Sequence, residues 1–210
     1  MADYRRLHDD ENADFGAYLA TLTPAEWEAP SLCEGWRVRD VVGHILYGNE
    51  LNVFTLPFKL ARHGFSSDRS GKVNSIARAE GCSPEELLHD FTTRNAWAGT
   101  ARLFGGRLTL LDRLVHHQDI RRALGHKREI PADRVLPLVE LAPKLGSVFG
   151  GRRRSKGLRM EATDLAWSHG PDGGPTVRGP GEAVLMAVLG RRQATADLEG
   201  DGVALLAGRS

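Results

Sequence analysis

Apolar side chains recur with helical spacing through the first 125 residues of the chain. Residues 3–22 and the segment that begins at Trp36 each place most of their apolar side chains on one helix face. Pro57 is expected to end or kink the second of these helices, because proline lacks the backbone N–H that a helix needs. Another helix is expected over residues 108–124, stopped near Gly125.

Two short motifs mark further helix starts. T-P-A-E at residues 23–26 and S-P-E-E at residues 83–86 both have the form of a capping box, in which a hydroxyl and a carboxylate satisfy the first backbone N–H groups. The first predicts a short helix that stops before Pro30, and the second predicts a helix through about Ala101. Residues 63–81 are rich in glycine, serine and charge and predict a loop. Four long helices joined by loops predict an up-and-down bundle.

The pattern changes after this predicted bundle. Residues 131–149 favour a helix interrupted by two prolines, and the run G-G-R-R-R-S-K-G at 150–157 predicts a hinge or a solvated hairpin. Apolar and polar residues then alternate over 158–163, which is typical of a strand. Because strand side chains point alternately to opposite faces, one buried face is expected to hold Leu158, Met160 and Ala162.

The chain length fits two small domains. It has 210 residues, of which 41% are hydrophobic, so each part can bury a core. Residues 181–189 predict a helix that follows the strands. The expected fold class is therefore α+β, with a helical domain at 1–128 and a small α+β domain at 129–210.

Charge and cysteine content narrow the class of function. The formal net charge is +1, which argues against a nucleic-acid binder even though Arg152 to Arg154 are adjacent cations. Two cysteines without a signal-like N-terminus favour a reducing, cytoplasmic setting. No apolar run approaches the ~18 residues of a membrane span, so no membrane partner is expected.

The predicted fourth helix carries a polar cluster beside its apolar face. Asp112, His116 and Asp119 are four and three residues apart, which places them on one side of the helix. Carboxylates and imidazoles that lie beside aliphatic side chains cost free energy unless they are paired, and a divalent cation bound between them would pair with them. The alternative is an exposed ion pair between Asp112 and a protonated His116. His117 lies about 100° further round the helix, where a structural or solvent-facing role is expected.

His44 on the second helix is the candidate third ligand. It lies between Val41 and Ile45, near the apolar face, where a lone histidine is usually hydrogen-bonded within the core. Two histidines and one carboxylate from two helices of one bundle would leave open positions on a metal, as catalytic sites require. Asp119 would then accept the spare N–H of His116 and fix its tautomer, or else pair with Arg122 in solvent.

Two segments resemble a known family. They are W-x-x-P-S-L-C-E-G-W-x-V-R-D-V-V-G-H at residues 27–44 and V-H-H-Q-D-I-R-R-A-L-G at residues 115–125. Together they resemble the mycothiol-dependent maleylpyruvate isomerase family, a branch of the DinB-like four-helix metalloproteins. The segment at 157–191 and the following L-E-G-D-G-V-A-L-L are similar to the small sterol-carrier-like α/β domain of that family.

The resemblance implies a function and a site. It implies that His44, Asp112 and His116 bind a divalent metal, which in this family is usually zinc, and that the sulfur of mycothiol meets that metal. The expected activity is isomerisation of, or thiol transfer to, a small electrophile such as maleylpyruvate, by a monomer or homodimer. Cys33 and Cys82 are expected to lie outside the ligand cluster and to take no part. A non-catalytic small-molecule-binding module with a structural metal is the alternative.

Two positions depart from the family pattern. Asp112 stands where relatives commonly have glutamate, so the metal must lie nearer to the fourth helix or the backbone must approach it. Arg37 stands where relatives often have serine or threonine, and the loss of that helix cap is expected to cost about 1 kcal/mol.

Overall fold

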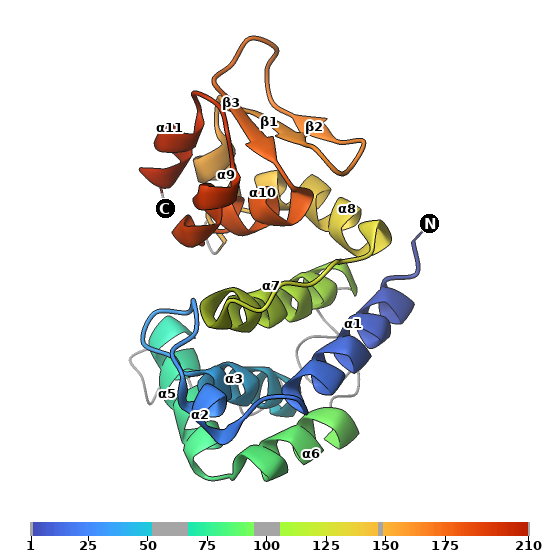
Figure 1. The fold of residues 1–210 in the computed structure, drawn as a ribbon, viewed down its shortest axis with the longest axis vertical. Coiled ribbons are helices and arrows are strands. Elements are labelled where there is room, and N and C mark those ends of the chain that lie inside the picture. Colours follow the sequence, from blue (N-terminus) through green and yellow to red (C-terminus); the bar gives the residue numbers. More distant parts are fainter. Residues whose placement is uncertain (1, 52–66, 95–105, 147–148, 210) are drawn as a thin grey trace. The chain divides into compact units, whose positions relative to one another are not determined.

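The computed structural model describes residues 2–51, 67–94, 106–146 and 149–209. The described chain divides into two compact units, Met1–Lys127 and Arg128–Ser210. It contains helices and a small three-stranded sheet, so the fold class is α+β (Figure 1). None of the described helices is long and apolar enough to cross a membrane.

The first unit is built from helices around one apolar core. In chain order these helices are α1 (Tyr4–Leu19), α2 (Pro24–Glu28), α3 (Val38–Glu50), α5 (Ser67–Glu80), α6 (Pro84–Arg94) and α7 (Gly106–Leu124). Helix α3 contacts α5, α6 and α7, and α1 contacts α6 and α7. All six helices contribute residues to this core. Its members include Phe15, Trp27, Val41, Ile45, Ala79, Leu87, Phe91 and Ile120.

Both predicted capping boxes are confirmed. The backbone N–H of Glu26 donates to the Thr23 hydroxyl, and the Glu26 carboxylate accepts from the backbone N–H of Thr23. Ser83 and Glu86 exchange the same pair of hydrogen bonds at the start of α6. The predicted end of this helix at Ala101 and the predicted stop at Pro57 lie outside the described residues.

The prediction of a loop at 63–81 is wrong for residues 67–80, which form helix α5. Small side chains hid this helix from the apolar pattern, because α5 packs on α3 by close backbone approach. A Cβ atom at Gly43 of α3 would lie 2.5 Å from the backbone oxygen of Ser75 and 3.0 Å from Cβ of Ala79. The described part of the first unit therefore holds one long helix more than predicted there, and the up-and-down order of four helices stays a prediction.

The second unit places a mostly buried helix against a small sheet. Its elements are α8 (Ala132–Leu141), the 3₁₀ helix η2 (Ala142–Lys144), α9 (Gly151–Ser155), β1 (Arg159–Ala162), β2 (Ser168–His169), β3 (Thr176–Gly179), α10 (Gly181–Val188), η3 (Arg192–Asp197) and α11 (Val203–Ala207). The strand order is β2-β1-β3, with β1 antiparallel to β2 and parallel to β3. Helix α10 contacts β1, β3 and α8 (Figure 1).

The predicted strand alternation is largely confirmed. Leu158 and Met160 are fully buried, whereas Arg159 and Glu161 are partly exposed and pair with each other. Ala162, predicted to be buried, is only half-buried. The prediction of a hinge or hairpin at 150–157 is wrong, because residues 151–155 form the short helix α9. Gly150 starts it in the left-handed conformation, and the backbone N–H of Arg154 donates to the carbonyl of Gly150.

Candidate metal centre

One face of α7 carries the acidic and imidazole groups predicted from the sequence. The Nε2 atom of His116 lies 3.6 Å from Oδ1 of Asp112, one helical turn earlier. The Nδ1 atom of His116 lies 3.1 Å from Oδ2 of Asp119, three residues later. The Asp119 side chain is fully buried, which excludes the solvated position that pairing with Arg122 in solvent would require. The carboxylate of Asp119 accepts the Nδ1–H of His116 and so leaves its Nε2 facing Asp112.

Helix α3 supplies His44 from the opposite side of the cluster. Its Nδ1 lies 3.3 Å from the hydroxyl of Ser75 on α5, and this hydroxyl donates its one proton to the carbonyl of Gly71 at 2.6 Å. Because that proton is already used, the Ser75 oxygen accepts from Nδ1–H of His44. This leaves the Nε2 atom of His44 facing the cluster, 3.9 Å from Oδ1 of Asp112.

The three side chains converge on one point. Their donor atoms all lie within 4.8 Å of one another, and the two imidazole rings have centroids 4.9 Å apart. The side chain of His116 is 11% exposed, that of His44 31% and that of Asp112 44%, so solvent reaches the cluster from the Asp112 side. Two ring nitrogens and a carboxylate oxygen lie close together here, and these are donor types that bind divalent cations.

The pKa values of His116 and Asp112 describe the charges of this cluster in the absence of a metal ion. Burial lowers the pKa of His116, but hydrogen bonds with Asp119 and Cys33 and the charge of Asp112 outweigh burial and raise it to about 10. Partial burial likewise raises the pKa of Asp112, and the two histidines and Arg113 more than reverse this, holding that pKa far below its ordinary value. In the absence of a metal ion, His116 is therefore protonated, and its Nε2–H faces the carboxylate of Asp112.

Cys33 lies beside the cluster, which corrects the expectation that both cysteines lie outside it. Its thiol donates to Oδ2 of Asp119 at 3.1 Å, and its Sγ lies 3.7 Å from Nδ1 of His116. The arrangement is not a nucleophile–base–acid relay, because the thiol and the carboxylate meet the same nitrogen of the ring. Cys82 is likewise a free thiol and lies elsewhere, beside Arg78.

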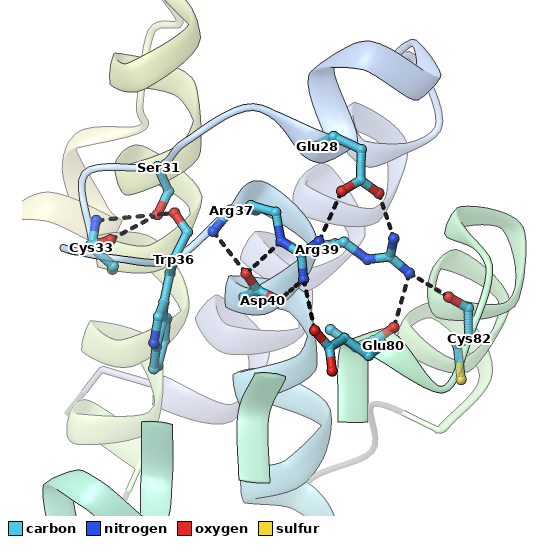
Figure 2. Close-up of polar contacts among 10 residues, drawn as sticks. Glu28, Ser31, Cys33, Trp36, Arg37, Arg39, Asp40, Glu80 and Cys82 are labelled. Carbon is cyan, nitrogen blue, oxygen red and sulfur yellow. Dashed lines mark hydrogen bonds and ion pairs between the residues drawn. The ribbon is translucent and has the colours of Figure 1, made fainter. Parts of the chain in front are cut away.

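A structured loop between α2 and α3 holds Cys33 in this position. The hydroxyl of Ser31 accepts from the backbone N–H of Cys33 and donates to the carbonyl of Trp36 at 3.0 Å (Figure 2). The backbone N–H of Leu32 donates to the backbone carbonyl of Asp119 at 3.1 Å, which ties the loop to α7. Gly35 adopts the left-handed conformation, with φ of 73°, at the tip of the loop.

Ion pairs fix the base of the same loop. Within the described residues the Arg37 side chain makes no capping hydrogen bond to α3, as predicted. Its guanidinium instead makes two hydrogen bonds to Asp40, at 2.9 and 3.0 Å, and one to Glu28 at 3.0 Å. Arg39 also pairs with Glu28 (Figure 2). The Arg39 guanidinium donates to the carbonyl of Ala79. Arg37 therefore links the loop to α2 and α3.

Trp36 forms an aromatic wall beside both imidazoles. Its ring centroid lies 5.0 Å from that of His44 and 6.4 Å from that of His116. The side chain is half-buried. An indole in this position excludes water from one side of the candidate site and so strengthens the electrostatic interactions within it.

His117 has a structural role, and the solvent-facing alternative is wrong. The ring is fully buried and stacks on Phe15 at a centroid distance of 4.3 Å. Arg121 donates to its Nε2 at 2.8 Å, so Nδ1 carries the proton and donates to Glu11 at 2.8 Å. Glu11 is itself fully buried on α1, and His117 therefore joins α7 to α1 and lies outside the cluster of His44, Asp112 and His116.

Comparisons with known proteins relate this geometry to a family. Residues 8–101, which include His44, match the model of the mycothiol maleylpyruvate isomerase N-terminal domain. Crystal structures of the mycothiol-dependent maleylpyruvate isomerase and of a histidine-to-alanine variant share the fold, each with a TM-score of 0.59 and 16% sequence identity. Each alignment covers 90% of this chain and 88% of the other. No curated protein matches the chain significantly. Within its first unit the chain therefore matches the N-terminal domain of the mycothiol maleylpyruvate isomerase family.

Proposed function

We propose that the protein is a metal-dependent, mycothiol-using isomerase or thiol transferase that acts on a small electrophile. The observation that carries the proposal is the cluster of two imidazoles and one carboxylate formed by His44, His116 and Asp112. The name of the matching family supports mycothiol as the thiol, and maleylpyruvate is the first electrophile to test.

The separations between the donor atoms fit a divalent cation. Zinc binds nitrogen at ~2.0–2.1 Å and carboxylate oxygen at ~2.0–2.2 Å in tetrahedral geometry, which places neighbouring donors about 3.3–3.4 Å apart. The two separations from Oδ1 of Asp112 are 3.6 Å to His116 and 3.9 Å to His44, so shifts of a few tenths of an ångström suffice. The shorter aspartate in place of glutamate therefore still reaches the cluster.

The surrounding side chains prepare the site for this cation. Asp119 holds the His116 ring and Ser75 holds the His44 ring, each through Nδ1–H, so that both Nε2 atoms face Asp112. Trp36 shields the two rings on one side. Three donors rather than four favour a catalytic site over a closed structural one.

Chemistry at such a site follows from its charge. A bound divalent cation lowers the pKa of a thiol and so supplies thiolate at neutral pH. In this proposal the attacking sulfur comes from the small thiol, and the side chains hold, orient and desolvate the site. The electrophile is expected to carry an electron-poor double bond or another carbon centre that thiolate attacks.

Removal of the metal is expected to abolish thiol-dependent turnover. The assay follows maleylpyruvate and a panel of small electrophiles with mycothiol, before and after treatment with a chelator and after zinc is restored. D112E should keep activity, because the carboxylate remains, whereas D112N should bind zinc more weakly, because the anionic ligand is lost. C82A serves as the matched control and should behave like the wild type.

Two outcomes would count against the proposal. Turnover that survives complete metal removal would contradict metal dependence. A fully metallated protein that turns over none of the electrophiles would favour the binding-module alternative.

Zinc binding is expected to release protons in a pH-dependent way. Because the pKa of His116 is about 10 without metal, its ring holds protons on both nitrogens near pH 8. Coordination through Nε2 replaces one of them, so about one proton should leave His116 at about pH 8, and this release should vanish as the pH rises above about 10. The apparent zinc affinity should rise over the same range.

Calorimetric titration of the metal-free protein with zinc, in buffers of different ionisation enthalpy, measures this release. D119N should release fewer protons at about pH 8, because it lacks the carboxylate that supports the charged ring. A release that is equal at about pH 8 and above pH 10 would contradict the protonated state of His116.

A further inference from the structure

A second set of donor atoms surrounds the other nitrogen of His116. Sγ of Cys33, Nδ1 of His116 and Oδ2 of Asp119 also lie within 4.8 Å of one another. Sulfur and carboxylate are 3.1 Å apart, nitrogen and carboxylate 3.1 Å, and sulfur and nitrogen 3.7 Å. This set shares only the His116 ring with the cluster formed by His44 and Asp112.

These separations also suit a metal ion. A tetrahedral zinc with Zn–S ~2.3 Å and Zn–N ~2.0–2.1 Å places its neighbouring ligand atoms about 3.3–3.6 Å apart. The observed values differ from this range by a few tenths of an ångström. Asp119 is fully buried and Cys33 half-buried, so an ion here would be largely enclosed.

We propose that Cys33, His116 and Asp119 form a second metal site, which prefers thiophilic ions such as Cd²⁺, Cu⁺ or excess Zn²⁺. The preference follows from the donor atoms, because thiolate is a soft ligand and the other cluster offers only nitrogen and oxygen. Binding releases the thiol proton of Cys33 and one ring proton of His116 to solvent, and leaves the ion coordinated by sulfur, nitrogen and oxygen.

The two sites cannot be filled together. A neutral imidazole has one lone pair and one proton. When Nδ1 of His116 binds an ion, its proton resides on Nε2 and points toward Asp112, where it displaces the other ion. An ion at Cys33 also takes Asp119 away from the hydrogen bond that orients the ring. This exclusion step rests on the proposed function, whereas the Cys33 site itself does not.

Cobalt titration of the full-length, chelator-treated protein tests the proposal without an activity assay. Thiolate bound to Co²⁺ gives an intense charge-transfer absorption in the near ultraviolet, whereas nitrogen and oxygen ligands give only weak visible bands. The wild type should develop the charge-transfer band as Co²⁺ is added in excess. The band should be lost in C33S, which keeps the size of the side chain, and kept in C82S, the matched control.

His44 separates the two proposals. H44A removes a ligand of the first cluster only, so it should keep the thiolate band and develop it at lower Co²⁺ concentration than the wild type. Absence of the band in wild type and H44A, or its persistence in C33S, would overturn the second site. If the weak visible bands of Co²⁺ are the same in wild type and H44A, His44 does not bind the ion. That result would overturn the first cluster and would not affect the conclusion drawn from the thiolate band. Thermal melts of C33S and H44A establish that both variants are folded.

Discussion

H116A is expected to abolish metal binding and, with it, thiol-dependent activity. His116 contributes to both donor sets, through Nε2 and Nδ1, and its loss leaves a single imidazole and one carboxylate in the first cluster. Such a pair chelates weakly, so the purified variant should hold less than about a tenth of the wild-type zinc. The measurement is elemental analysis of protein purified without chelator.

Two further variants, D119N and H89A, serve as comparisons for the zinc content of H116A. D119N removes the carboxylate that orients His116 but no ligand of the first cluster, so its zinc affinity should fall by only about 10–100-fold. H89A changes an exposed histidine on α6 and should keep the full zinc content. Wild-type zinc content in H116A would show that the zinc is bound at another site.

E11A is expected to destabilise the first unit by about 3–5 kcal/mol, the cost of breaking a buried charged pair. Glu11 is fully buried, accepts the Nδ1–H of His117 and lies near the guanidinium of Arg113, which is 2% exposed. Its removal takes away one of the two carboxylates, Asp112 being the other, whose charges stabilise the Arg113 cation. Urea denaturation followed by fluorescence and circular dichroism measures the free energy of unfolding.

The matched control lies on the exposed face of the same helix. Asp10 pairs with Arg6 at 2.8 Å, with both side chains largely in solvent. D10A should therefore cost less than about 1 kcal/mol. If E11A cost no more than D10A, the buried network would contribute little to stability, and α1 would be held to α7 by apolar packing alone.

The sequence was sufficient to place His44, Asp112 and His116 near one another. The shared face of Asp112 and His116 follows from helix periodicity alone, because residues four apart share a face whatever the tertiary fold. His44 required the further assumption that its helix packs in the same bundle, and the family motif supplied it. The hydrogen bond from His116 to Asp119 was predicted on the same grounds, and these atoms lie 3.1 Å apart.

The features that sequence reasoning missed depend on tertiary contacts. Helix α5 has few large apolar side chains, since its contact with α3 is made by small residues and backbone. Cys33 belongs to a loop, and no periodicity relates a loop residue to a helix 83 positions later in the chain. The conformation of that loop depends on Gly35, on Ser31 and on ion pairs with two helices. The sequence contains these residues, but it does not show which of them contact one another.

The close contact of Gly43 on α3 with Ser75 and Ala79 on α5 means that substitutions in one helix constrain those in the other. Gly43 precedes His44 and touches the backbone of α5, which carries the Ser75 hydroxyl that orients the His44 ring. A lineage that acquired a larger residue at 43 would have to move α5 away and would lose that hydroxyl as a partner. Substitutions at 43, 75 and 79 should therefore appear together among descendants of this sequence, and lineages that keep the metal should keep glycine at 43.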